Sequence, residues 1–346
     1  MLHKAPDSLV PHSLTQDEIT RHISTHPQIR PDGLDLPRTP ETIVVRGGFP
    51  NDEETWHDND LVEIVRDPNA PSRLAFLRWN NGTPAILHEI DHDGKHYVPP
   101  PKGAGLLAKI VLPDRMNPSG STRELALDLE SVISRFVEID PDDVQKSVSF
   151  VLSSWFPECF ETVPYLWLLG LFGGAKTTLL KVLRCLCRRS VLVGDICAAG
   201  LYRLAHETDI TLLIDEVELD GSRSSSEMAR LLRSGNTRGT DTIRNGQRFS
   251  TFCFKVLASR QPPTDGALSS RSLFVSMRPT TKSLPVLDAR AQLQIIQKFQ
   301  SRMLAFRLEN LSQMKRYQFP QQELAESPLL FSAVAFNDFA NRHYWQ

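Results

Sequence analysis

The spacing of hydrophobic residues changes several times along the chain of 346 residues. Short apolar runs of strand type come first, helical spacing follows, and the two kinds then alternate before a last helical stretch. This pattern predicts five regions. They are an irregular or disordered arm at 1–40, a β-rich accessory region at 41–118, a helical hairpin at 119–160, an α/β domain at 161–285 and a helical region at 286–346.

The β-rich region shows strand runs bounded by Gly, Asn, Asp and Pro, at 42–45 and 61–65. The runs 74–79 and 85–90 flank Asn81-Gly82, which is the residue pair that a two-residue hairpin turn favours. Asp93-Gly94 predicts a second hairpin turn.

Three histidines in this region, His88, His92 and His96, are spaced four residues apart beside several acids. On a helix this spacing would align the imidazoles for a metal ion. A turn at Asp93-Gly94 would instead scatter these side chains over a strand, a turn and the returning strand. The hairpin interpretation is favoured, and no metal is predicted here.

Two helices are marked by their first residues. Ser121 and Glu124 are three positions apart, as in a capping box, and apolar residues then recur on one face. Asp140-Pro141 predicts the start of the next helix, with Asp140 as its cap.

From residue 165 onward, apolar strands alternate with amphipathic helices. The predicted strands are 165–169, 191–193, 211–214, 252–258 and 273–277, and the predicted helices are 177–188, 198–207 and 224–233, the last capped at Ser224. Such alternation indicates an α/β fold with a mostly parallel sheet covered by helices. Asn245-Gly246 predicts a hairpin at 243–249. Further helices are expected at 291–311 and 331–339, and the aromatic residues at the end of the chain suggest that the C-terminal region is truncated.

The amino-acid composition limits the classes of protein to which this chain can belong. The chain is 40% hydrophobic and 23% charged with a net charge of −2, so any nucleic-acid surface must be local. Five cysteines without a CxxC pair fit reduced thiols. No apolar run reaches the ~18 residues of a membrane span, and no signal peptide is evident. We therefore expect a cytoplasmic protein.

The candidate chemistry centres on a turn of small residues between the strand at 165–169 and the next helix. This turn, Gly170 to Thr178, contains Lys176-Thr177, and the strand at 211–214 ends in Asp215-Glu216. Strand, glycine-rich turn with Lys-Thr, helix, and strand with paired acids form the layout of a phosphate-binding loop and its metal-binding partner. A glycine-rich turn that binds no nucleotide is the alternative.

Each residue of this motif has an expected role with ATP and Mg²⁺. Lys176 would contact the β- and γ-phosphates, Thr177 and Asp215 would hold Mg²⁺, and Glu216 would polarise the attacking water. The expected nucleotide-binding residues are Gly170, Gly173, Gly174, Ala175, Lys176, Thr177, Thr178, Asp215 and Ser259.

Ala175 departs from the pattern G-x-x-x-x-G-K-[ST], which has glycine at this position. If the position requires a positive φ, the Cβ costs on the order of 1 kcal/mol. If it is already helical, alanine is tolerated.

Basic and polar residues later in the chain add candidates. Ser259 ends a predicted strand and could sense the γ-phosphate, although serines at strand ends are common. Arg271 could reach across a subunit boundary as an arginine finger, or be plain surface. Arg238, Arg244 and Arg248 could follow a nucleic-acid backbone, or lie at a subunit interface or on a solvated face.

Residues 165–279 resemble the ATPase module of phage- and plasmid-type primase–helicases, within the AAA+/superfamily-3 group. The resemblance is carried by Pro164–Trp167, Gly170–Thr178, Asp195–Ala199, Thr211–Glu216, Ser234–Gly239 and Ser270–Ser272. It implies an ATPase that forms a homo-oligomeric ring and acts on DNA. Single-stranded DNA is the expected form of this partner. It further implies that Lys176, Glu216 and Arg271 are catalytic and that Ser259 is the sensor. No primase or zinc-finger segment accompanies it.

Three functions therefore compete. The first is a DNA-dependent ATPase of helicase type. The second is a nucleotide-gated assembly or regulatory protein in which Ala175 weakens hydrolysis. The third is a metabolic P-loop enzyme such as a small-molecule kinase, which the paired acids and Arg271 disfavour.

Overall fold

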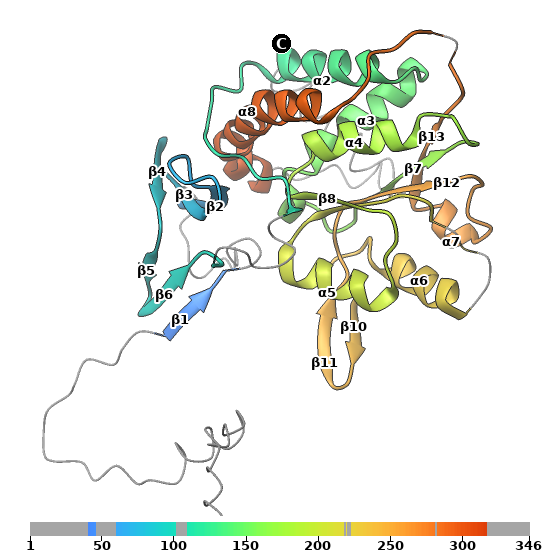
Figure 1. Cartoon of the computed structure of the whole chain (residues 1–346). Coiled ribbons are helices and arrows are strands. Elements are labelled where there is room, and N and C mark those ends of the chain that lie inside the picture. The colour runs from blue at the N-terminus through green and yellow to red at the C-terminus, as the bar shows by residue number, and fades with distance from the viewer. Residues whose placement is uncertain are drawn as a thin grey trace, which may run out of the picture. The chain divides into compact units, whose positions relative to one another are not determined.

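The central feature of the fold is a five-stranded sheet in which all neighbouring strands run parallel (Figure 1). The computed structural model describes residues 41–45, 60–101, 109–217, 219, 223–280 and 282–316. The strand order is β13 (Ser272–Ser276), β7 (Tyr165–Leu169), β12 (Lys255–Ser259), β9 (Thr211–Ile214) and β8 (Ser190–Val193). The predicted α/β class with a parallel sheet is confirmed.

Helices cover both faces of this sheet (Figure 1). On one side lie α2 (Thr122–Phe136), α3 (Pro141–Ser153), α4 (Lys176–Leu186) and α8 (Ala289–Arg316), and on the other lie α5 (Ala198–Thr208) and α6 (Arg223–Ser234). Successive side chains of a strand point to opposite faces. Accordingly, Leu166 and Leu168 of β7 pack into the hydrophobic core of the first side, while Tyr165 and Trp167 pack into the second.

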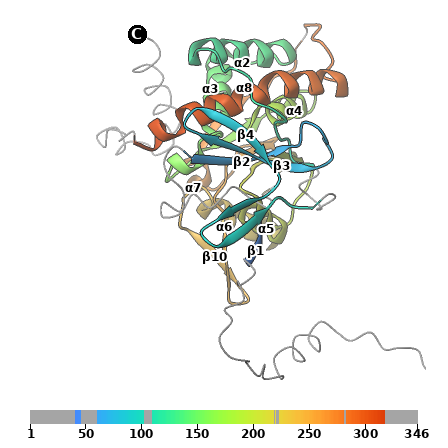
Figure 2. The ribbon, with the colours of Figure 1, turned by 90° about the vertical axis from the view of Figure 1, so that its left-hand side faces the viewer.

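The β-rich region forms two small sheets (Figure 2). One pairs β1 (Glu41–Val44), β6 (Lys95–Val98) and β5 (Ile90–His92), and the other is an antiparallel set of β2 (Asp60–Arg66), β3 (Leu74–Asn80) and β4 (Thr83–Leu87). The predicted hairpin turn is present, because Asn81 and Gly82 have φ values of 47° and 87°. Buried residues of β2 and β3 join the same hydrophobic clusters as the helices around the large sheet.

The three histidines of this region lie on different elements. His88 follows β4, His92 ends β5 and His96 is part of β6. His88 Nε2 lies 2.9 Å from Asp67 Oδ2, and His96 Nδ1 lies 2.7 Å from Asp91 Oδ1. Within the ranges that the structure describes, no three His, Cys, Asp or Glu side chains are grouped so as to hold a metal ion.

The first turns of α2 and α3 are held differently. Ser121 and Glu124 form the predicted capping box. Asp140, by contrast, makes no side-chain cap, which corrects the prediction. The amides of Asp143 and Val144 bond the Asp140 backbone carbonyl instead. The Asp143 carboxylate accepts the Ser276 amide at 2.8 Å, which ties α3 to the end of β13.

A separate two-stranded hairpin, β10 (Asp241–Arg244) and β11 (Gln247–Ser250), follows α6 and lies beside α5 (Figure 1). Its turn at Asn245-Gly246 has positive φ at both residues, as predicted. The Phe249 ring packs on Tyr202 of α5, with ring centroids 4.8 Å apart. This contact fixes the hairpin's base to the helix.

Several helices and strands begin or end at other residues than the sequence predicted. The helix expected to reach Arg188 ends at Leu186, because Arg188 and Arg189 are drawn into buried ion pairs. The helix expected to be capped by Ser224 begins at Arg223, which places Ser224 inside it. The strand expected to begin at Phe252 begins at Lys255.

Some of the remaining predictions concern residues that the structure describes, and others do not. The arm at 1–40, the helix at 331–339 and the suggested C-terminal truncation lie outside the described residues. All five cysteines are free thiols. None of the described helices has the length and apolar character needed to cross a membrane.

Candidate functional site

The glycine-rich turn lies at the carboxyl edge of the sheet, where β7 passes into α4. Its first glycine is required by packing: a Cβ on Gly170 would lie 2.4 Å from the Met277 carbonyl oxygen, just past β13. No side chain fits at that distance. β7 lies between β12 and β13, so the turn emerges between two neighbouring strand ends, as ligand sites of parallel sheets commonly do.

Ala175 occupies the N-cap position of α4 in the left-handed conformation, with φ 57° and ψ 18°. This decides between the two cases left open by the sequence: the position does require a positive φ, so its Cβ is strained. The turn that glycine would provide at no cost is therefore formed here by alanine, at a cost of about 1 kcal/mol.

Lys176 opens α4 and bends back over the turn. Its ammonium donates to the carbonyl oxygen of Gly170 and, at 3.0 Å, to that of Leu171. The cation thus lies over the loop that would surround the phosphates. A bound nucleotide would exchange these carbonyl partners for phosphate oxygens, which are the stronger acceptors.

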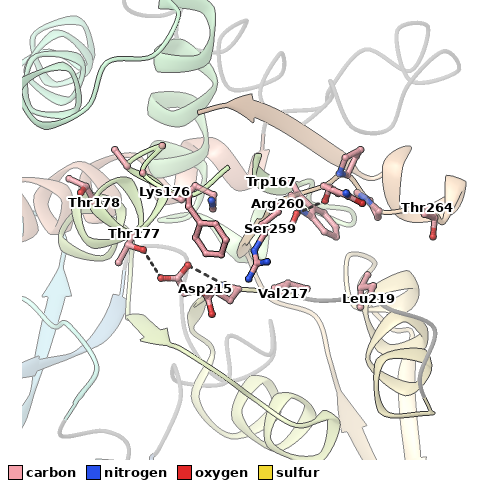
Figure 3. A pocket seen from close by; sticks show the side chains of 18 residues that line it. Trp167, Lys176, Thr177, Thr178, Asp215, Val217, Leu219, Ser259, Arg260 and Thr264 are labelled. Carbon is pink, nitrogen blue, oxygen red and sulfur yellow. Dashed lines mark hydrogen bonds between the residues drawn. The ribbon is translucent and has the colours of Figure 1, made fainter. Parts of the chain in front are cut away.

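Thr177 and Asp215 meet across the site. The Thr177 hydroxyl donates to Asp215 Oδ2 at 2.8 Å (Figure 3). Asp215 directly follows β9, so the structure joins the two predicted metal ligands although they are 38 positions apart in sequence. Hydroxyl and carboxylate oxygens are the donors that Mg²⁺ prefers, and this pair therefore fits the ion.

Glu216 lies beside Asp215 with its side chain exposed and its backbone in a left-handed conformation, φ 54°. Its amide donates to Asp215 Oδ1 at 3.1 Å, which holds the neighbouring carboxylate in place. Non-glycine residues with positive φ cost free energy and gather at functional sites. Two such residues, Ala175 and Glu216, border this one.

These residues line one cavity of about 690 Å³. Of the predicted nucleotide-binding residues, the cavity is lined by Gly173, Gly174, Ala175, Lys176, Thr177, Thr178, Asp215 and Ser259, together with Glu216. Gly170 lies behind the turn, against Met277, and Arg271 is outside the cavity lining.

Ser259 contributes less to the cavity than its position at the strand end predicted. Its side chain is buried, with the residue 7% exposed. Its hydroxyl accepts the Trp167 indole N–H at 2.7 Å and donates to the Gln261 carbonyl at 2.6 Å. These bonds hold β12 against β7 at the edge of the site.

The arginine predicted to act in a neighbouring subunit is anchored within its own chain. Arg271 Nη1 donates to the Ala267 carbonyl at 2.5 Å, in the short helix α7 (Gly266–Ser269). Its own carbonyl accepts the Tyr165 amide at the start of β7. The side chain is half-buried. Its role in a second subunit stays a prediction.

The predicted nucleic-acid arginines have protein partners. Arg244 Nη2 lies 2.9 Å from Glu227 Oε1, and Arg248 pairs with Asp241 across the hairpin. Arg238 lies 4.3 Å over the Phe252 ring and donates to the Pro157 carbonyl at 2.7 Å. Of these two ion-paired arginines, Arg248 has the more exposed side chain, with 75% of it accessible to solvent. A role with DNA stays a prediction for all three.

The sequence reasoning did not predict every residue that lines the cavity, and Arg260 and Phe172 are among those it missed. The Arg260 guanidinium lies 4.1 Å from the centre of the Phe172 ring, and both side chains line the cavity. Figure 3 shows Arg260 at this edge of the cavity. The available signal was Phe172 itself, a large aromatic residue within a turn of small ones. For Arg260 the available signal was its position directly after Ser259, within a basic stretch of the chain.

Comparisons with known proteins give weak likenesses. No protein family model matches the chain, and no curated protein matches it. Among solved structures, the apo C-terminal region of NrS-1 (305–718) has a TM-score of 0.35 at 12% identity, over 80% of this chain and 72% of that one. Inhibitor-bound JCV helicase has a TM-score of 0.32 at 16% identity, over 63% and 61% of the two chains. At these values the likeness assigns neither a family nor a function.

Proposed function

We propose that this protein is a Mg²⁺-dependent P-loop ATPase of helicase type, which hydrolyses ATP in a homo-oligomer and acts on DNA. The observation that carries the proposal is the contact between Thr177 and Asp215 at 2.8 Å, beside Lys176 and within one cavity. A glycine-rich turn with a merely structural purpose has no need of a hydroxyl, a carboxylate and an ammonium group together at its open side.

The residues of the cavity divide the work of phosphoryl transfer. The amides of the turn and Lys176 would bind the phosphates, and Thr177 and Asp215 would hold the metal, which would supply charge neutralisation on the phosphates. Glu216 is exposed beside Asp215, where a carboxylate can accept a proton from an attacking water.

The oligomer and the nucleic acid rest on the sequence resemblance together with two surface features. Arg271 lies outside the cavity of its own chain, so a catalytic role for it requires a neighbouring subunit. The hairpin β10–β11 carries Arg244 and Arg248 at either side of its turn. A strand of DNA would have to compete with Glu227 and Asp241 for these two side chains.

The second candidate function, a nucleotide-gated assembly or regulatory protein, is favoured by one observation. Ala175 places a Cβ in the left-handed position where the pattern has glycine. A strained turn beside the phosphates would bind nucleotide and hydrolyse it slowly. In that case ATP would change the oligomer rather than drive movement on DNA.

Phosphate release measured with and without single-stranded DNA separates these functions. A helicase-type ATPase releases phosphate faster when DNA is present. Nucleotide binding without stimulation by DNA would reject the helicase type and favour the second function. Lys176→Ala should abolish nucleotide binding, and unchanged binding in this variant would reject the phosphate-binding site itself.

A further inference from the structure

The Ser259 hydroxyl at the end of β12 has no hydrogen left for a ligand. A serine hydroxyl carries one hydrogen, and here that hydrogen is directed to the Gln261 carbonyl at 2.6 Å, since a carbonyl can only accept. The Trp167 indole, which can only donate, bonds the same oxygen at 2.7 Å (Figure 3). Trp167 is buried in β7, which pairs with β12. Ser259 therefore fixes the Gln261 carbonyl relative to the sheet and is not placed to sense a phosphate.

The segment after Ser259 lines the cavity. Residues 260–264 all contribute to the lining, together with Lys176 and Thr177 of the glycine-rich turn. Pro262 and Pro263 carry no backbone N–H, so neither residue can donate a backbone hydrogen bond to a ligand. Side chains are therefore the main source of hydrogen-bond donors along this wall of the cavity.

Gln261 combines a fixed backbone with an unengaged side chain. Its carbonyl accepts the Ser259 hydroxyl, and Pro262 directly after it restricts its backbone to extended conformations. Its side chain is exposed and lines the cavity. Among the residues that the structure describes, none forms a hydrogen bond with its carboxamide. A carboxamide has two N–H donors and phosphate oxygens accept hydrogen bonds, so this group fits a phosphate bound in the cavity.

We propose that the Gln261 carboxamide donates a hydrogen bond to the γ-phosphate of a nucleotide in this cavity, and that Ser259 is a positioning residue that acts through the Gln261 carbonyl. The inference rests on the proposed nucleotide-binding function. It assigns to Gln261 the phosphate contact that the strand-end position suggested for Ser259. The ligand that it selects is a nucleoside triphosphate over a diphosphate, because a diphosphate lacks the group that Gln261 contacts.

The experiment compares the affinities for a non-hydrolysable ATP analogue and for ADP, measured by calorimetry with magnesium present, in wild-type protein and in Gln261→Ala. We expect the affinity for the analogue to fall roughly 10-fold, which is the loss of a hydrogen bond to a charged group, and the affinity for ADP to change by less than ~2-fold. Gln261→Glu keeps the length of the side chain but places a negative charge opposite the phosphate, and it should lower the affinity for the analogue further. Wild-type affinity in Gln261→Glu would contradict the contact.

Gln294→Ala is the matched control. Gln294 is also an exposed glutamine, but it lies on α8 and outside the cavity lining. Its substitution should leave both affinities unchanged.

Ser259→Ala tests the positioning role. It frees the Gln261 carbonyl and should lower the preference for the analogue over ADP by roughly 3- to 10-fold, because the carboxamide is then no longer held in place. In the Gln261→Ala background the same substitution should lower the preference no further, since both changes act on one contact. A general loss of stability would not change this ratio, because both ligands bind the folded protein. An unchanged ratio in Ser259→Ala rejects the positioning role, and a further fall in the double variant rejects an action through Gln261.

The outcomes separate this inference from the proposed function. If wild-type protein binds neither nucleotide, or if Lys176→Ala binds both as well as wild type does, the proposed function fails. If Lys176→Ala abolishes binding while Gln261→Ala keeps the wild-type ratio of affinities, the site stands and the role of Gln261 is rejected. An equal loss of affinity for the analogue and for ADP in Gln261→Ala also rejects it.

Discussion

Glu63 on strand β2 accepts a hydrogen bond from Arg307 on helix α8 at 2.6 Å, although 244 positions separate them in sequence. The same carboxylate receives Arg188 at 3.0 Å and Arg189 at 3.0 Å from the segment that joins α4 to β8. Arg307 in turn pairs with Glu158. The buried carboxylate of Glu63 therefore connects three parts of the chain: the β-rich region, the segment between α4 and β8, and helix α8.

Glu63→Gln should destabilise the protein strongly. The amide keeps the shape of the side chain but removes the one carboxylate that pairs with all three buried guanidiniums, which leaves, among the described residues, only Glu158 and Asp209 to compensate them. Removing one partner of a buried ion pair costs about 3–5 kcal/mol. The free energy of unfolding from urea denaturation checks this value. Asp114→Asn is the control, because the Asp114–Arg115 pair is exposed, and it should leave stability nearly unchanged.

Low pH should reduce the free energy of unfolding, partly through the protonation of Glu63. Burial alone would raise the pKa of Glu63, but the guanidiniums of Arg188, Arg307 and Arg189 outweigh burial and hold its pKa far below the ordinary value. In the unfolded chain the carboxylate takes up a proton near pH 4.3. Its contribution to stability is therefore complete above about pH 4.3 and is lost as the pH falls toward the folded-state pKa.

Glu63→Gln should accordingly flatten the acid limb of the stability curve. One proton fewer taken up on unfolding reduces the slope by about 1.4 kcal/mol per pH unit below pH ~4. Urea unfolding at several pH values between about 3 and 5 gives the slope for both proteins. Equal slopes would mean that Glu63 does not retain its charge in the folded protein.

The strands around the site could be predicted because each carries its own signal. Tyr165–Leu169 and Thr211–Ile214 are short apolar runs between turn residues, and both have the predicted bounds. Burial on both faces of a parallel sheet requires such runs, so the pattern is local. The pairing of Thr177 with Asp215 followed from the motif, since both residues lie at the carboxyl edge of the sheet.

Side-chain partners that lie far apart in sequence could not be predicted in this way. The Ser259 hydroxyl is occupied by Trp167, 92 positions away, and no spacing rule links those two residues. Arg188 was expected to end a helix, and its buried pairing with Glu63 on another sheet overrides the helical pattern. Propensity describes a segment alone, while these contacts depend on how segments pack.

Ala175→Gly should stabilise the protein, because glycine adopts φ 57° without the strain that a Cβ imposes. The gain is limited to about 1 kcal/mol, since glycine also gives the unfolded chain more freedom. Gly173→Ala is the reverse change at φ 77°, where an added Cβ would meet no atom within 4 Å. It should cost about 1 kcal/mol through the backbone alone. Urea denaturation measures both, and a loss of stability in Ala175→Gly would contradict the strained conformation.

The contact between Thr177 and Asp215 predicts that magnesium tightens nucleotide binding and that each residue is needed for it. Removing even an outer partner of a metal ligand costs roughly 10- to 100-fold in metal affinity, so Asp215→Asn and Thr177→Val should each lose at least ~10-fold. Thr177→Ser keeps the hydroxyl and should retain the effect. Calorimetric titration of ATP with magnesium and with a chelator gives the difference. Asp215→Asn and Thr177→Val combined should lose little more than either alone, because both act on one ion. Full magnesium dependence in Thr177→Val would remove Thr177 from the metal site.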